Sequence, residues 1–390
     1  MKTLFKTALL ILTLTTVLCN ANNKINKQSL LALNTTTVDT SIDEPKKTVK
    51  VALLLDTSNS MDGLIDQAKA QLWEIVNELS YAKCEHEDAD LKIALYEYGN
   101  DNLEASDGYI RQVIGFSGDL DEISEKLFSL TTNGGSEHCG EVIQTSLNEL
   151  KWGTNKDDLK LIFIAGNEPF TQGNINYKDA STNATEKDVV VNTIFCGNYN
   201  TGIQGEWQNG AKLTGGDYLS IDQNKGLVHI STPYDDIIIK LNGKLNKTYV
   251  RYGDEGSSKY ANQSTQDSNA ENLEEAVLVK RAVSKSSKMY RNKSWDLVDA
   301  EKETDFDYST IDKKTLPEEL KNKSTVELKI FVKKQSVERE KIQKEIQELN
   351  KKRKKYITEN KKENTSEETL DSAMIKAIKN QAKKKNYTWE

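Results

Sequence analysis

Three oxygen-bearing side chains alternate directly after an apolar stretch near residue 50. Asp56, Ser58 and Ser60 follow the run 49–55, in the sequence VALLLDTSNS. Alternate residues of a tight loop can turn toward one point, so one carboxylate and two hydroxyls can converge there. Oxygen donors of this kind suit a hard cation such as Mg²⁺. The alternative is an ordinary helix start, in which Asp56 caps a helix beginning near Asp62 and the serines are turn residues.

The segments on either side place these residues at one edge of a sheet. The run 49–55 has Lys50 as its only charge, which indicates a strand buried on both faces. The polar residues that follow then lie at the carboxyl end of that strand, where open α/β sheets bind their ligands. A helix is expected next, over 64–82, because its apolar residues recur at helical spacing.

Strands and helices alternate through the first part of the chain. Strands are expected over 48–56, 91–99, 109–116, 159–165, 189–196 and 217–221, and helices over 64–82, 119–130, 137–150, 207–213 and 234–249. The second and third strands are expected to form a hairpin. Such alternation requires a largely parallel sheet with helices on both faces. The predicted fold class is therefore α/β, with a doubly wound, mainly parallel sheet, followed by an α-helical C-terminal region.

The pattern Asp-x-Ser-x-Ser between a buried strand and a helix resembles a known metal site. It is similar to the metal-ion-dependent adhesion site of the von Willebrand factor A (vWA) domain family, in its exported bacterial type. The order of elements over residues 48–250 fits that family, which covers roughly half of the chain. The resemblance implies bound Mg²⁺ or Mn²⁺, with Ser58 and Ser60 as direct ligands and Asp56 binding directly or through water.

The resemblance also implies a ligand from a second loop, a threonine before a helix. The sequence TTNGGS over 131–136 has two glycines and then a hydroxyl, which selects Ser136. A serine hydroxyl still serves as a ligand in place of threonine. The alternative is that Ser136 caps the helix, with Glu137 and Glu141 favouring its positive end.

A third loop should supply an aspartate after the strand 159–165. On the family pattern Asn167 holds that position, an amide in place of a carboxylate. The amide oxygen can still reach the ion or a bound water, but one negative charge is lost. Mg²⁺ commonly keeps several waters, so a reduced set of protein ligands is tolerated. The alternative is that Asn167 is a turn residue.

The chemistry of such a site predicts binding rather than catalysis. Mg²⁺ with an unfilled position attracts a carboxylate, so the expected partner is a protein that presents Asp or Glu. Glu137 and His138 lie beside the site and could contact that partner. No zinc spacing, nucleophile elbow, Walker loop or dinucleotide motif is visible, and the chain is not expected to be an enzyme. Glu168 is the one nearby candidate for a general base in metal-assisted hydrolysis.

The first residues predict export. Lys2 and Lys6 precede an apolar stretch over 8–18, and Cys19-Asn20-Ala21 offers a cleavage site after residue 21. We therefore expect a signal peptide over 1–21 and a flexible linker over 22–47, in a secreted, periplasmic or cell-envelope protein. The alternative is a lipoprotein anchored through Cys19, which the residues before it fit poorly.

The net charge and the cysteine content bear on nucleic-acid binding and on disulfide formation. The net charge of −7 argues against general nucleic-acid binding. Cys84, Cys139 and Cys196 remain after cleavage, an odd number. Cys139 and Cys196 are the preferred disulfide pair because both fall near element ends on one predicted rim. The alternative is three buried thiols that act as small hydrophobes.

The region 251–390 is expected to be helical. A linker or exposed loop is expected over 254–269, helices over 271–290, 317–362 and 366–385, and a docking segment around Trp295. Ile342, Ile346 and Leu349 are spaced as in a coiled-coil seam, so the helix over 317–362 could mediate self-association. No transmembrane helix is expected in the mature chain. The rival function is a structural envelope protein whose metal site is vestigial and whose helices mediate its interactions.

Overall fold

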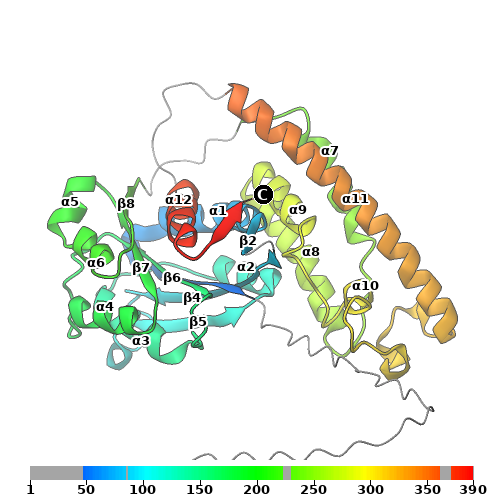
Figure 1. Ribbon diagram of the computed structural model, residues 1–390, viewed down its shortest axis with the longest axis horizontal. Helices are drawn as coiled ribbons and strands as arrows, with labels where there is room; N and C mark the ends of the chain where they lie inside the picture. The colour runs from blue at the N-terminus through cyan, green and yellow to red at the C-terminus, as the bar shows by residue number, and fades with distance from the viewer. Residues whose placement is uncertain (1–46, 85–86, 223–229, 361–369, 390) are drawn as a thin grey trace, which may run out of the picture. The chain divides into compact units, whose positions relative to one another are not determined.

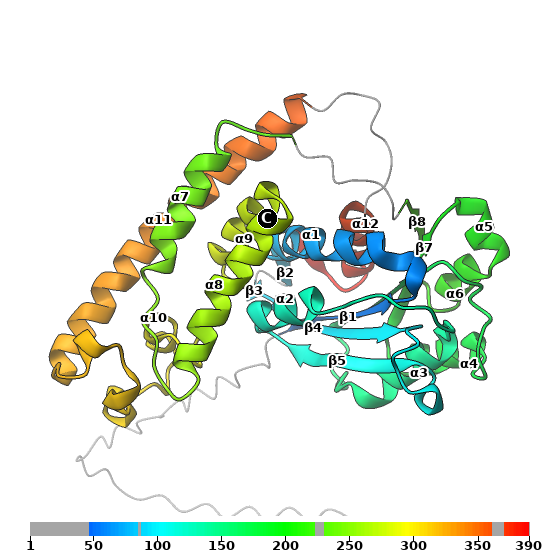
Figure 2. The ribbon, with the colours of Figure 1, turned by 180° about the vertical axis from the view of Figure 1, so that it is seen from behind.

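The computed structural model describes residues 47–84, 87–222, 230–360 and 370–389. A central sheet of six strands has the order β5-β4-β1-β6-β7-β8 (Figure 1, Figure 2). Its strands are β1 (Thr48–Asp56), β4 (Asp90–Tyr98), β5 (Ile110–Ser117), β6 (Leu159–Gly166), β7 (Val190–Cys196) and β8 (Tyr218–Ile221). All neighbours are parallel except the expected hairpin of β4 and β5, which is antiparallel. The predicted α/β class with a doubly wound sheet is confirmed.

Strand β1 lies at the centre of this sheet because almost all of its side chains are apolar. Leu53 is aligned with Leu95 of β4 on one side and with Phe163 of β6 on the other. Lys50, the single basic residue of β1, lies near the amino end of the strand. Its ammonium group donates to the Trp152 carbonyl at 2.8 Å and is 3.0 Å from the Asp158 carboxylate. A buried charge is thus paired, as burial requires.

Helices cover both faces of the sheet. They are α1 (Asp62–Leu79), α2 (Leu120–Phe128), α3 (Cys139–Glu149), α4 (Tyr177–Glu186), α5 (Tyr199–Gln204) and α6 (Trp207–Leu213). Helix α7 (Asp235–Asn246) packs instead against α9 and α11 of the C-terminal region (Figure 1). Alternate residues of β1 enter two different cores, because successive side chains of a strand point to opposite faces. Leu53 and Leu55 pack with Trp73 of α1, whereas Leu54 packs with Ile143 of α3.

Two of the helices that cover the sheet were not among the expected elements. Both α4 and α5 are short and lack a long apolar stripe. Each is preceded by an asparagine whose side chain caps it. Asn176 accepts a hydrogen bond from the Lys178 backbone amide at the start of α4, and Asn198 accepts one from the Asn200 backbone amide at the start of α5. Asparagine is a strong N-cap residue, so these two positions carried the signal for the helix starts.

The C-terminal region is helical, as predicted. It contains α8 (Gly256–Leu273), α9 (Glu275–Lys285), α10 (Leu297–Ala300), α11 (Thr325–Asn360) and α12 (Leu370–Lys383). The expectation of a loop over 254–269 is wrong, because α8 spans it. Its buried side is polar and bonded: Gln263 donates to the Tyr290 hydroxyl at 2.9 Å, and Gln266 accepts from Ser124 at 2.9 Å. Because the buried side of α8 carries side-chain amides, its sequence lacks the apolar residues at helical spacing that predict a helix.

The long helix starts later than expected. Residues 318–320 form a short 3-10 turn, and α11 begins at Thr325. Ser324 and Glu327 form a capping box, in which the Glu327 carboxylate accepts from the Ser324 amide at 2.8 Å. The seam residues Ile342 and Ile346 are buried in the same core as α7 and α9. The apolar seam is therefore covered within this chain.

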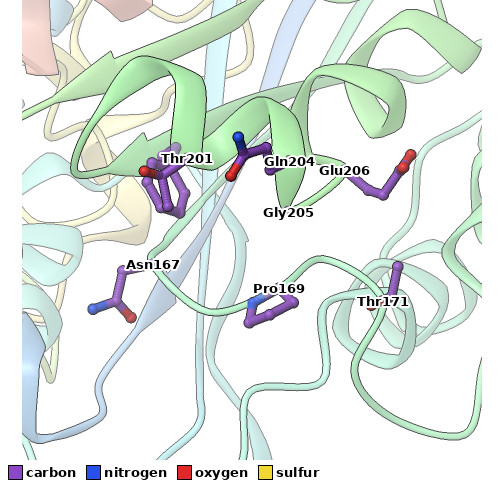
Figure 3. Close-up of a pocket in the computed structure, with 8 residues that line it drawn as sticks. Asn167, Pro169, Thr171, Thr201, Gln204, Gly205 and Glu206 are labelled. Carbon is purple, nitrogen blue, oxygen red and sulfur yellow. The ribbon is translucent and has the colours of Figure 1, made fainter.

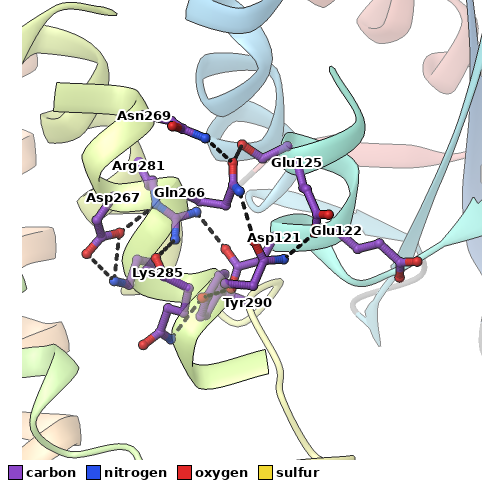
Figure 4. Close-up of polar contacts among 12 residues, drawn as sticks. Asp121, Glu122, Glu125, Gln266, Asp267, Asn269, Arg281, Lys285 and Tyr290 are labelled. Atoms are coloured by element: carbon purple, nitrogen blue, oxygen red, sulfur yellow. Dashed lines mark hydrogen bonds and ion pairs between the residues drawn. The ribbon is translucent and has the colours of Figure 1, made fainter. Parts of the chain in front are cut away.

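Buried ion pairs connect the C-terminal helices to the helices around the sheet (Figure 4). The guanidinium group of Arg281 on α9 lies 2.7 Å from Asp121 on α2 and 2.6 Å from Asp267 on α8. Lys285 lies 2.9 Å from Asp267, and the Tyr290 hydroxyl donates to Asp121. Each cation has a carboxylate partner, so this network links α2, α8 and α9 without an uncompensated charge.

A second buried arginine anchors α11. The Arg339 guanidinium group lies 2.6 Å from the Asp296 carboxylate and donates to the Thr248 carbonyl at 2.8 Å. It also stacks over the Tyr249 ring at 4.0 Å from the ring centre. Trp295, the expected docking residue, is buried and stacks on the same tyrosine. The described residues, from 47 onward, belong to one compact unit.

The end of the chain returns to the beginning of the fold. A small sheet contains β2 (Ala82–Cys84), β3 (Glu87–Asp88) and β9 (Tyr387–Trp389) in the order β3-β2-β9. Helix α12 packs on α1 and β6. No helix among the described residues has the length and apolar character needed to cross a membrane. The predicted signal peptide, most of the predicted linker and the alternative lipid site at Cys19 lie outside the described residues.

Candidate metal centre

The loops after β1 and β6 leave the sheet at its topological switch point. From β1 the sheet grows in one direction through β4 and β5, and in the other through β6, β7 and β8. The carboxyl edge at such a point is where open α/β sheets bind ligands. The first loop is held by its backbone, because Thr57 donates to the Tyr98 carbonyl at 2.9 Å and Met61 to the Ser58 carbonyl at 3.0 Å.

Asp56 ends β1 and is fully buried. Its Oδ1 accepts a hydrogen bond from the Ser58 amide at 2.8 Å, whereas its Oδ2 has no hydrogen-bond partner. The backbone of Gly166 passes close to this oxygen. If residue 166 had a side chain, its Cβ would lie 3.0 Å from Asp56 Oδ2 and 2.6 Å from the Tyr98 hydroxyl. A glycine is therefore needed directly before Asn167.

The electrostatic environment of Asp56 opposes its ionisation. Burial raises the pKa of this carboxyl group to about 7, and the charges of Glu137 and Glu168 add to the rise. The hydrogen bond from the Ser58 amide and the nearby Ser58 hydroxyl act in the opposite direction. Burial also raises the pKa of Glu137, to which Glu168 contributes. The site therefore gathers negative potential that a cation would neutralise.

Asn167 joins the third loop to the first. Its side-chain amide nitrogen donates to the Ser60 hydroxyl at 3.0 Å. Its Oδ1 is buried and has no hydrogen-bond partner, and the buried Ser58 hydroxyl makes no hydrogen bond of regular geometry. Buried oxygens that lack partners are uncommon and call for an explanation. Asp56, Ser58 and Asn167 thus each bring an unsatisfied oxygen to the same edge of the sheet.

The second loop lies against the loop that follows β4 and contacts the first loop. A Cβ on Gly135 would lie 1.9 Å from the Gly99 carbonyl oxygen, so the two backbones are in close contact there. The Asn133 amide donates to the Thr57 carbonyl at 3.0 Å, and the Thr132 hydroxyl donates to the Asp62 carboxylate. These contacts bring residues 131–137 to the edge where β1 ends.

Ser136 is placed in this second loop, between Gly135 and Glu137. Helix α3 begins at Cys139 with His138 as its N-cap, so Ser136 does not cap it. No hydrogen bond among the described residues involves the Ser136 side chain. The Glu137 side chain lies close to Asp56, with Gly99 beside both. A Cβ built on Gly99 would be 2.9 Å from Glu137 Cγ and 3.1 Å from Asp56 Oδ1. Sequence reasoning placed Glu137 only beside the site.

The donor set fits a hard cation with a partly aqueous shell. Among the residues that the structure describes, no group of three or more His, Cys, Asp or Glu side chains is arranged to hold a metal ion. One carboxylate, hydroxyls and an amide oxygen would have to hold it. Mg²⁺ binds through a few oxygen ligands and keeps waters, so this oxygen-only set fits Mg²⁺ better than a nitrogen- or sulfur-seeking metal.

The preferred disulfide is not formed. Cys84, Cys139 and Cys196 are all buried, and none of them forms a disulfide. Cys139 packs in the core that contains Leu54, whereas Cys196 packs in the core that contains Leu53, on the opposite face of the sheet. Burial raises the pKa of both thiols. The alternative interpretation, in which the thiols act as small buried hydrophobes, therefore describes them correctly.

Comparison with known proteins gives matches to solved structures alone. No protein-family model matches the sequence, and no curated protein matches it. The SpRpn10 VWA domain is 16% identical over 47% of this chain and 100% of its own, with a TM-score of 0.35. BatB from Bacteroides thetaiotaomicron is 17% identical over 45% of this chain and 90% of its own, with a TM-score of 0.34. Proximal thread matrix protein 1 from the mussel byssus is 14% identical over 45% of this chain and 42% of its own, also with a TM-score of 0.34.

Proposed function

We propose that this chain is a metal-dependent protein-binding module, with an adhesion or scaffolding role, in an exported protein. Mg²⁺, or Mn²⁺, is held at Asp56, Ser58, Ser60, Ser136 and Asn167, and a partner presents an Asp or Glu side chain to it. The observation that carries the proposal is the buried, unpartnered Oδ2 of Asp56 at the switch point of the sheet.

The charges around Asp56 support a cation rather than a neutral ligand. A buried carboxylate without a counter-charge is costly, and Glu137 and Glu168 increase that cost. The bound ion supplies positive charge and an open coordination position for a partner's carboxylate. The chain orients the ion through Asp56 and Ser58, whereas the exposed Ser60 lies where a partner can approach. The module has no catalytic role in this proposal.

Calorimetric titration of the mature chain, residues 22–390, with Mg²⁺ and Mn²⁺ tests the proposal. The wild type should bind one ion with a saturable isotherm, and the double variant Ser58→Ala with Ser60→Ala should lose it. The matched control is Ser129→Ala with Ser268→Ala, at two exposed serines outside the site. A flat titration of the wild type, in the presence and absence of an acidic peptide, would contradict the proposal.

A second candidate function is a structural envelope protein whose interactions are made by the C-terminal helices. It is favoured by the exposed apolar side chains of Val326, Ile330 and Val337 on α11, which are 66%, 65% and 57% exposed. Self-association through this face would appear in light scattering as an oligomer that persists in EDTA. The triple change of these residues to Ser would return the chain to a monomer, and a monomeric wild type would exclude this route.

A further inference from the structure

A groove opens beside the proposed metal centre (Figure 3). It has a volume of about 350 Å³ and runs between the loop after β6 and the corner between α5 and α6. Asn167, Pro169 and Thr171 line one side, and Thr201, Gln204 and Glu206 line the other. Asn167 lines this groove and belongs to the proposed metal site, so the two lie next to each other.

The two sides of the groove are fixed to each other at its base. The Phe170 amide donates to the Gly205 carbonyl at 2.9 Å, and the Trp207 indole nitrogen donates to the Glu168 carbonyl at 2.7 Å. The rings of Phe170 and Phe195 both pack edge-on against Trp207. A groove whose walls are bonded in this way is formed before a ligand arrives, which reduces the entropy cost of binding.

Among the described residues that line the groove, Glu206 is the one with a charged side chain. Its backbone has φ of 70°, the left-handed region that residues other than glycine rarely adopt. Its carboxylate accepts hydrogen bonds from the Tyr177 hydroxyl at 3.0 Å and from Asn209 at 2.9 Å. These hydrogen bonds lower its pKa, so Glu206 is ionised at neutral pH. Strained backbone at a pocket wall is a feature of ligand-binding sites.

We propose that the groove receives a Lys or Arg side chain of the partner whose carboxylate binds at the Asp56 loop. This rests on the proposed function of the metal centre. The apolar stem of such a side chain would lie against Pro169 and Phe195, and its cationic head near Glu206. The volume is at the small end of ligand pockets and leaves room for one long side chain. Because Asn167 is shared, the partner's acidic and basic side chains lie close together in space, and a short peptide that carries both can present them.

A random heptapeptide library displayed on phage provides the test, with the mature chain, residues 22–390, as bait in Mg²⁺. Peptides selected by the wild type should carry an acidic residue and, at a fixed short spacing from it, Lys or Arg. Glu206→Gln should keep the acidic preference and lose the basic one, at least about tenfold in enrichment. Glu206→Lys should replace the basic preference by an acidic one. The matched control Glu186→Gln, at an exposed glutamate outside the groove, should select the same peptides as the wild type.

The outcomes separate the two proposals. Acidic peptides without a basic residue, selected equally by wild type and Glu206→Gln, would overturn the groove assignment and leave the metal centre intact. Selection that is unchanged in EDTA would overturn the metal centre, and no selected sequence at all would overturn both. A second readout is independent of the metal: acetyl-arginine amide, titrated in EDTA, should shift the amide resonances of Thr171 and Thr201. These shifts should disappear in Glu206→Gln, and their absence in the wild type would also contradict the assignment.

Discussion

The side-chain amide of Asn167 donates a hydrogen bond to the Ser60 hydroxyl at 3.0 Å, which ties the loop after β6 to the loop after β1. The nitrogen is occupied by this bond, and Oδ1 is left buried without a partner. The residue that replaces the expected aspartate therefore still presents an oxygen at this edge. The lost carboxylate removes one negative charge from a site that already holds Asp56 close to Glu137 and Glu168.

Restoring the carboxylate should strengthen metal binding. Asn167→Asp adds a charge beside the ion, and we expect Mg²⁺ affinity to rise by about tenfold or more, roughly 1.4 kcal/mol. Calorimetry of the variant against the wild type measures this. Without metal the variant should melt at a lower temperature, because a further carboxylate joins the acidic cluster. An unchanged affinity would show that residue 167 does not face the ion.

Metal binding should depend on pH around neutrality. The pKa of Asp56 is raised to about 7, and the ion competes with the proton that Asp56 then holds. Apparent Mg²⁺ affinity should therefore increase as the pH rises from 6 to 8, by up to about tenfold per unit below the pKa. Titrations in two buffers of different ionisation enthalpy give the number of protons released. Asp56→Asn should release none, and a flat pH profile in the wild type would contradict the assignment.

The same group should limit the stability of the metal-free chain. The unfolded carboxyl ionises with a pKa of 3.8 and the folded one with a pKa of about 7, so stability falls as the pH rises between these values. Asp56→Asn removes this penalty and should stabilise the metal-free chain above pH 7, by up to about 4 kcal/mol. The difference in the free energy of unfolding between Asp56→Asn and the wild type should shrink toward pH 4. Urea unfolding in EDTA at pH 5 and pH 8 tests it, and a variant less stable than the wild type at pH 8 would refute it.

Removing Arg281 should strongly destabilise the fold. Its guanidinium group is buried between Asp121 and Asp267, and Arg281→Ala would leave both carboxylates without their shared cation. Breaking a buried pair in this way costs about 3–5 kcal/mol. The control Arg291→Ala, at an exposed arginine, should change stability by less than about 0.5 kcal/mol. Urea denaturation measures both, and similar values for the two variants would contradict the structural role of the network.

Deleting the end of the chain should also destabilise the sheet region. A stop after residue 360 removes α12, whose buried residues Leu370, Met374 and Ile378 belong to the core shared with α1. The lost burial is worth on the order of 5 kcal/mol. The truncated chain should unfold at a lower urea concentration and bind a hydrophobic dye, whereas Lys383→Ala, at an exposed residue of α12, should behave as the wild type. Unaltered stability of the truncated chain would show that α12 is dispensable.

The sequence by itself determined the elements whose signals are local. The apolar runs of β1, β4, β6 and β7 and the stripes of α1 and α2 predicted the α/β class. The alternation of Asp56, Ser58 and Ser60 predicted where the candidate site begins. The buried face of α8 is polar, and α4 and α5 are short, so their apolar periodicity is weak and these helices were missed.

Tertiary structure decided how distant side chains meet. Which face of the sheet each thiol occupies depends on strand register and helix packing, so sequence alone could not separate Cys139 from Cys196. The approach of Glu137 to Asp56 depends on the close contact of Gly135 with Gly99. The cover over the Ile342 and Ile346 seam depends on α7 and α9 of the same chain. Burial and long-range electrostatics arise from these contacts, and a local pattern does not encode them.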